Sequence, residues 1–191
     1  FNYEQDPARI SYDTEAMGLP KAEAYVGFDF WANKFVPPFE KTLTAELPAH
    51  ACRVLAIRPA SDDPQLISTS RHVTQGMVDV TDETWDPSAQ TLSAVSQVVS
   101  NDPYELRIVL PYGETSWRMT SVTVSPEDVA AGVTAEFRQD GARVRVTLFS
   151  RTSRNVTWTA AFERAVVKAT APRPVTQAKA RVEYNQITVT W

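Results

Sequence analysis

Few side chains in this sequence have the types and spacing that enzyme chemistry requires. Its two histidines, His50 and His72, are accompanied by a single cysteine, Cys52. Zinc sites use three or four cysteine, histidine or carboxylate ligands at defined spacing, and the sequence has no such motif. His72 follows Ser68 and Ser70, but the Gly-x-Ser-x-Gly motif that presents a nucleophilic serine is missing. We therefore expect no metal site, no cofactor and no catalytic residue in this chain.

A stretch rich in carboxylates is the second place where chemistry could occur. It contains Asp79, Asp82, Glu83 and Asp86. Glycoside hydrolysis needs two carboxylates that face each other across the scissile bond, and spacing along the chain cannot show such a pair. A calcium loop needs acidic residues at alternating positions, a glycine and a distal glutamate, and this stretch does not have that pattern. We interpret it as a solvated turn.

Aromatic rings on the surface are a third possibility, because carbohydrate-binding modules stack sugars on them. Trp158 is in phase with the apolar residues of its strand, so we expect it in the core. Trp85 lies in a sequence typical of a turn, and Trp117 follows a loop that contains Tyr112. Trp85, Trp117 and Tyr112 are thus the candidate carbohydrate-binding residues. The alternative is that these rings fold back over a sheet edge.

Short runs of alternating apolar and polar residues, broken by Pro, Gly, Asn and Asp, would position these side chains. The predicted strands cover residues 24–31, 42–47, 52–57, 66–70, 76–80, 92–99, 104–110, 118–124, 133–137, 144–148 and 156–162. Asp140-Gly141 predicts a hairpin with a type I′ turn, and residues 125–132 predict one short helix. Ten to twelve short strands predict an all-β fold, an antiparallel β-sandwich with one buried and one wet face for each strand.

A Pro-rich link at residues 170–174 divides the chain. We expect a β-sandwich accessory domain over residues 1–170. Residues 171–191 would then be a linker and two strands, 178–184 and 186–191. These two strands resemble the opening of a fibronectin type III-like module, and the alternative is that they are the last strands of the sandwich.

Charge and hydropathy exclude two classes of partner. The formal net charge is -4, and phosphate binding needs clustered Lys and Arg, so we expect no nucleic acid partner. No apolar stretch approaches the roughly 20 residues of a membrane-spanning helix. Cys52 cannot form an internal disulfide. Exported bacterial domains often lack disulfides, so export or a periplasmic location is compatible with the sequence and the compartment stays open.

Several strand and turn sequences resemble one family. They are Tyr25-Val26-Gly27-Phe28-Asp29-Phe30-Trp31 and the stretches 47–59, 64–76 and 102–106. Over about residues 8–165 the chain resembles the C-terminal β-sandwich that follows the catalytic barrel in α-galactosidase-like (melibiase-type) glycoside hydrolases. In that family the catalytic aspartates lie on the barrel, so the resemblance carries no catalytic residue to this chain.

The resemblance implies a non-catalytic accessory domain of a larger glycoside hydrolase, whose partner is the catalytic barrel of the same polypeptide. Asp29, Phe30 and Trp31 would lie near that domain interface. Trp31 also breaks the phase of Phe28 and Phe30 and so faces away from them. The chain begins with Phe1, and we interpret it as a segment of a longer protein. Two alternatives stay open, a carbohydrate-binding module and an adhesion or structural domain of a cell surface.

Overall fold

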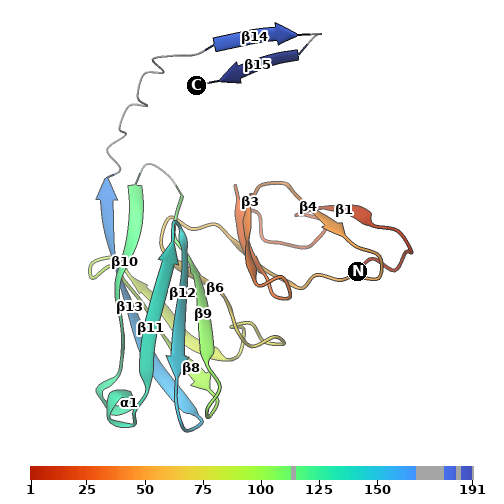
Figure 1. Ribbon diagram of the computed structural model, residues 1–191. Helices are drawn as coiled ribbons and strands as arrows, with labels where there is room; N and C mark the ends of the chain where they lie inside the picture. Colours follow the sequence, from red (N-terminus) through yellow and green to blue (C-terminus); the bar gives the residue numbers. More distant parts are fainter. Residues whose placement is uncertain (113–114, 167–178, 184–185, 191) are drawn as a thin grey trace.

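The structure is a computed structural model that describes residues 1–112, 115–166, 179–183 and 186–190. It confirms the all-β class, because every sheet is antiparallel and two four-stranded sheets form a sandwich (Figure 1). The first sheet, in spatial order, consists of β10 (Thr115–Val124), β13 (Arg154–Val166), β8 (Thr91–Val98) and β7 (Val80–Asp86). The second consists of β11 (Thr134–Asp140), β12 (Arg143–Phe149), β9 (Tyr104–Val109) and β6 (Gln65–Thr69).

The core lies between these two sheets. Trp158 of β13 is fully buried there, as its phase predicts, and packs among buried aliphatic side chains of both sheets. Its indole Nε1 donates a hydrogen bond to Ser96 Oγ on β8 (2.9 Å), so the one polar atom of the ring is satisfied. The alternation of β8, β12 and β13 thus fills one continuous interior.

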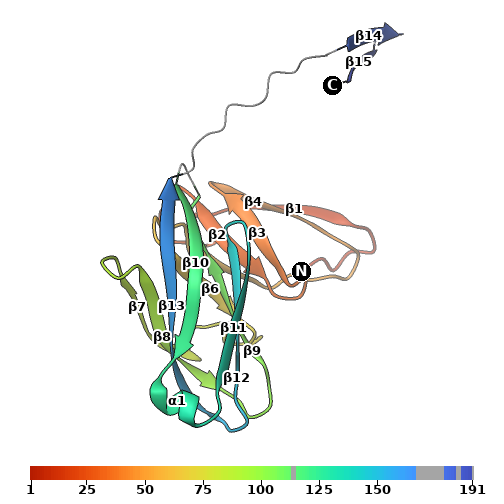
Figure 2. The same cartoon turned by 60° about the vertical axis from the view of Figure 1, so that its left-hand side comes forward.

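A third layer covers the outer face of the second sheet (Figure 2). It consists of β3 (Lys34–Phe39), β2 (Tyr25–Asp29) and β5 (Leu55–Pro59), in that order. Val26 and Phe28 of β2 pack against Ile67 of β6 and Val109 of β9. The prediction of one wet face is therefore wrong for β9, because this strand is covered on both sides. β1 (Ala8–Asp13) pairs with β4 (Thr42–Leu47) beside this layer.

Gly27 of β2 lies where β5 comes closest. A Cβ there would lie 2.7 Å from the backbone oxygen of Ala56, a contact that real side chains do not make. We expect Gly27→Ala to lower the free energy of unfolding by about 2 kcal/mol, since β5 must shift outward. Urea denaturation measures this loss. Gly18→Ala is the control: Gly18 has a φ of 70° and open space around it, so its cost is about 1 kcal/mol. An equal loss at both positions would contradict the close approach.

Several predicted elements differ from the observed ones. Residues 76–79 form the end of a turn and a bend, so the strand predicted over 76–80 is wrong, and β1 and β3 were not predicted. The strand predicted over 52–57 begins at Leu55 and forms an edge of its sheet. The hairpin between β11 and β12 exists, but its loop is Gly141 and Ala142. Only Gly141 has a positive φ, as in a type II′ turn.

The carboxylate-rich stretch is not a turn. Most of it forms β7, an edge strand of the sandwich, and its register shifts between Thr81 and Thr84 where Asp82 has a φ of 57°. Asp82, Glu83 and Asp86 are exposed, as solvated side chains would be, whereas Asp79 is buried. The sequence pattern failed here because a bulge interrupts the alternation that marks a strand.

The predicted helix is confirmed as α1 (Pro126–Ala130), with Ser125 Oγ accepting a hydrogen bond from the Asp128 amide. β14 (Lys179–Glu183) and β15 (Gln186–Thr190) form an antiparallel hairpin. The predicted domain boundary near residue 170 lies outside the described residues, and so does the whole linker before residue 178. Whether the hairpin opens a further module stays a prediction.

Candidate functional site

Trp85 and Trp117 lie on strands, not in loops. Trp85 belongs to β7 and Trp117 to β10, and their rings meet edge to face, with centroids 5.7 Å apart and planes at 78°. Trp117 is 6% exposed. Trp85 packs against the sandwich core, and its ring centroid lies 6.0 Å from that of Phe162. The two rings therefore do not form the coplanar, open platform on which sugars stack.

Tyr112, the third candidate carbohydrate-binding residue, is exposed and lines a separate groove with Glu23. Sugar binding by these three residues stays a prediction.

Asp29, Phe30 and Trp31 mark the end of β2 and the turn that follows it. The Asp29 carboxylate is buried, is bonded by the Nε of Arg53, and accepts a hydrogen bond from the Ala32 amide (3.0 Å). These contacts fix the turn. Trp31 is 60% exposed at its tip, with its ring edge to face against Phe30, centroids 5.1 Å apart. The turn thus presents a large apolar ring to solvent on a rigid support.

His72 joins this turn from a distant part of the sequence. Its ring centroid lies 6.0 Å from that of Phe30 and 6.1 Å from that of Trp31. We call these three residues the Trp31 surface. Ser68, the serine considered as a partner of His72, is buried, and its Oγ accepts a hydrogen bond from Arg107 (3.2 Å). His72 is therefore an element of an aromatic surface, which its local sequence does not reveal.

A buried carboxylate holds the loop that carries His72. Asp79 accepts hydrogen bonds from Thr69 Oγ1 (2.7 Å), the Tyr104 hydroxyl (2.7 Å) and the Gly76 amide (2.8 Å). Burial alone would raise the pKa of Asp79, but these hydrogen bonds outweigh it and hold the pKa below its ordinary value. Asp79 thus remains charged and fixes the segment between β6 and β7. Three apolar side chains of this segment are exposed: Val73, Met77 and Val78.

The outer face of β9 and β12 carries a network of charges. Glu105 Oε1 accepts from Arg107 Nε (3.0 Å) and Arg145 Nη1 (2.5 Å), and its other oxygen lies 3.6 Å from Arg138 Nη2. The Arg107 guanidinium is buried 3.9 Å from the centre of the Phe28 ring, and this burial lowers its pKa. Arg107 and Arg145 are cross-strand partners, so Glu105 offsets the repulsion between two like charges.

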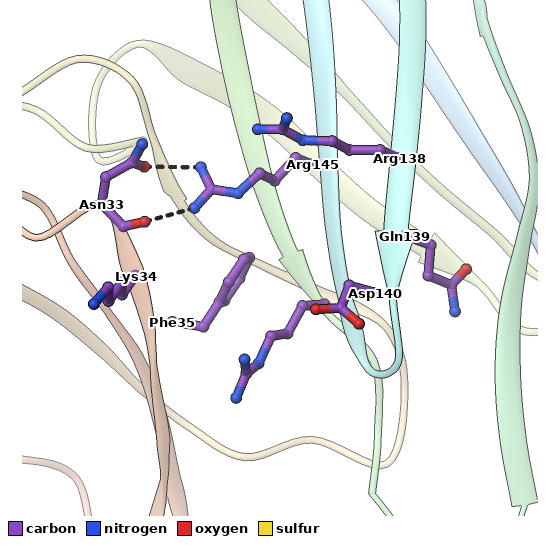
Figure 3. A pocket seen from close by; sticks show the side chains of 8 residues that line it. Asn33, Lys34, Phe35, Arg138, Gln139, Asp140 and Arg145 are labelled. Atoms are coloured by element: carbon purple, nitrogen blue, oxygen red, sulfur yellow. Dashed lines mark hydrogen bonds between the residues drawn. The ribbon is translucent and has the colours of Figure 1, made fainter.

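A pocket of about 340 Å³ opens beside this network (Figure 3). It lies between the turn after β2 and the β11–β12 hairpin. Arg145 donates hydrogen bonds to the side-chain oxygen and the backbone oxygen of Asn33, both at 2.8 Å, and so joins the two walls. Lys34, Phe35, Arg138 and Arg143 also line the pocket, together with Gln139 and Asp140.

Sequence reasoning missed this arginine pocket. Its only local signal is that Arg138, Arg143 and Arg145 flank the Asp140-Gly141 hairpin. Those residues are ordinary on a solvated strand face, and what makes them a site is the third layer, which the sequence pattern did not place. We take the Trp31 surface and the arginine pocket as the candidate functional features.

No family model matches this sequence, and no match is found among curated proteins or solved structures. In the described parts of the chain, no helix is long and apolar enough to cross a membrane. Among the same residues, no three His, Cys, Asp or Glu side chains gather in a way that could hold a metal ion.

Proposed function

We propose that this chain is a non-catalytic accessory β-sandwich of a larger glycoside hydrolase and packs against the catalytic barrel of the same polypeptide. The Trp31 surface is the observation that carries this proposal. Exposed tryptophans held in a fixed orientation are typical of the central residues of protein interfaces, where they contribute most of the binding energy. The family resemblance supplies the identity of the partner.

The surroundings of Trp31 support an interface. His72 lies against its ring, and the loop of His72 exposes Val73, Met77 and Val78. Exposed apolar side chains on a loop that carries one ring of an aromatic cluster are typical of contact sites in soluble proteins. Asp29 and its bond to Arg53 keep the turn in one conformation, which lowers the entropy lost on docking.

The environment of the buried Asp79 and the partly buried Glu105 supports a role without catalysis. Asp79 accepts three hydrogen bonds that hold its pKa below its ordinary value, and Glu105 contacts three arginines. A general acid or base at neutral pH instead needs a carboxyl whose pKa is raised and whose oxygens can reach substrate. These two groups are engaged in holding loops and strands.

Two experiments test the proposal: reading the coding sequence upstream of Phe1, and substituting Trp31. We expect the region before Phe1 to encode a barrel with paired catalytic carboxylates, and the isolated chain to hydrolyse no aryl α-galactoside. Trp31→Ala should weaken docking of the sandwich on the barrel by about 2 kcal/mol, because a hot-spot ring is lost. Separately expressed barrel and sandwich, titrated by calorimetry, measure this change.

Tyr12→Ala is the matched control, since Tyr12 is also an exposed ring but lies on β1. Trp31→Ala should leave the stability of the isolated sandwich within about 0.5 kcal/mol of the unsubstituted chain, as expected for an exposed side chain. An upstream region without a barrel would overturn the proposal, and so would equal effects of the two substitutions on docking.

Carbohydrate binding is the second candidate function. The arginine pocket favours it, since it combines an aromatic wall with amide, carboxylate and guanidinium groups.

A further inference from the structure

We propose that the arginine pocket binds a carboxylate-bearing saccharide, such as a uronic acid unit. The site is separate from the Trp31 surface, and only the choice of a saccharide over other anions rests on the proposed function. The carboxylate would lie against the cations of the hairpin, and the sugar ring against Phe35.

The charge of the pocket points to an anion. Its lining and the network behind it contain five cations, Lys34, Arg107, Arg138, Arg143 and Arg145, but two carboxylates, Glu105 and Asp140. The whole chain has the opposite balance, with a formal net charge of -4. A local excess of positive charge in an acidic protein concentrates anions at that place.

Two cations are available to a ligand. Glu105 engages Arg107 and Arg145 at short distance and Arg138 at 3.6 Å. Lys34 and Arg143, by contrast, have no carboxylate within ion-pair distance in the described part of the chain, and both are exposed. A guanidinium can bind a carboxylate through two parallel hydrogen bonds, which makes Arg143 the main recognition group and Lys34 a second positive charge.

The pocket is preorganised. Arg145 is bonded to Glu105 behind it and to both oxygens of Asn33 in front, so the two walls are joined through one side chain. Arg138 and Arg145 extend from the hairpin in the direction of Asn33 (Figure 3). The ligand therefore meets walls that are already in place, and little conformational entropy is lost on binding.

The other groups fit a sugar. Phe35 is half-buried, and its edge-to-face contact with Phe28, centroids 5.1 Å apart, holds its ring in place. Asp140 offers oxygens that accept hydrogen bonds from hydroxyl groups. A volume of about 340 Å³ is at the lower end of the range of small-molecule pockets, roughly 300 to 1,000 Å³, so it suits a short saccharide.

Isothermal titration calorimetry of the whole chain tests the site. The probe is trigalacturonate, and the neutral galactotriose, a sulfated chondroitin disaccharide and tetraglutamate are compared with it at the same ionic strength. We expect trigalacturonate to bind with a dissociation constant below about 1 mM, and more weakly as salt is added. The other three probes should bind at least about tenfold more weakly, a difference of about 1.4 kcal/mol.

The variant Lys34→Gln/Arg143→Gln should weaken trigalacturonate binding at least about tenfold. Both side chains are exposed, so the fold should persist, and circular dichroism checks this. Arg151→Gln is the control, because Arg151 is exposed in the loop after β12 and carries the same charge. It should leave the affinity unchanged.

Four results would overturn the proposal: no binding of trigalacturonate, equal binding of galactotriose, equal or tighter binding of the sulfated disaccharide or tetraglutamate, and unchanged binding by the double variant. Failure of the proposed function is recognised separately, by an upstream region without a barrel, and does not depend on this titration.

Discussion

Glu105→Gln should lower the free energy of unfolding by about 3 kcal/mol. Glu105 is the carboxylate between Arg107 and Arg145, and Arg107 is buried with 5% of its surface exposed. Removing one partner of a buried ion pair leaves a charge without compensation, which typically costs 3–5 kcal/mol. The neutral amide keeps one hydrogen-bond acceptor, so we expect the lower end of that range. Urea denaturation at neutral pH measures the change.

Glu163→Gln is the matched control. Glu163 of β13 pairs with Arg118 of β10 at 2.6 Å, but Arg118 is largely exposed, so this pair contributes about 0 to 1 kcal/mol. The double variant Glu105→Leu/Arg107→Met should be more stable than Glu105→Gln, because it removes both charges from the interior. If Glu105→Gln lowers the free energy of unfolding by no more than Glu163→Gln does, the Glu105 network does not stabilise the contact between the third layer and the sandwich.

Asp79→Asn should cost about 2–3 kcal/mol at neutral pH. The Asp79 oxygens accept hydrogen bonds from Thr69, Tyr104 and the Gly76 amide. An asparagine must turn its own N–H groups toward at least one of these donors, which leaves buried polar groups unpaired. The same substitution should loosen the loop of His72, and so weaken docking through the Trp31 surface as well.

The effect of Asp79→Asn should depend on pH. Hydrogen bonds to the buried Asp79 carboxylate hold its folded pKa below its ordinary value of 3.8. The carboxylate therefore contributes stability that is fully present above about pH 4 and is lost as the pH falls through the folded pKa. The gap in unfolding free energy between the unsubstituted chain and the variant should narrow below about pH 4. Asp62 is exposed, so Asp62→Asn serves as the control, and its unfolding free energy should not differ from that of the unsubstituted chain in this way. A pH-independent gap would contradict the charged state.

Strand periodicity was enough to predict the sandwich. β8, β12 and the run around Trp158 follow an alternation of period two, because in each of them one face packs on the core between the two sheets. The helix after Ser125 was also predictable, since a cap and a proline at the first position act locally. Local signals were sufficient wherever a residue's role depends on its immediate neighbours.

The candidate site depends on long-range contacts that such signals do not contain. Arg107 has the same alternating pattern as a solvated residue, yet the third layer buries it under Phe28. His72 and Trp31 meet only because two loops at the ends of different sheets come together. Trp85 looked like a turn residue because Asp86-Pro87 follows it, yet it lies on β7 and its ring packs against Trp117. Each of these placements is decided by which sheets stack, and no short window of sequence records that.

The bulged edge strand β7 has a consequence for solubility. An edge strand exposes unpaired backbone groups, to which the edge of another molecule can add and so begin aggregation. In β7 the kink at Asp82 spoils the straight edge that such pairing needs, and Asp82 and Asp86 place negative charges along it, whereas Glu83 is paired with Arg58 (3.1 Å). Two copies that approach through this edge would repel each other. We therefore expect Asp82 and Asp86 to oppose the extension of this sheet into a neighbouring molecule.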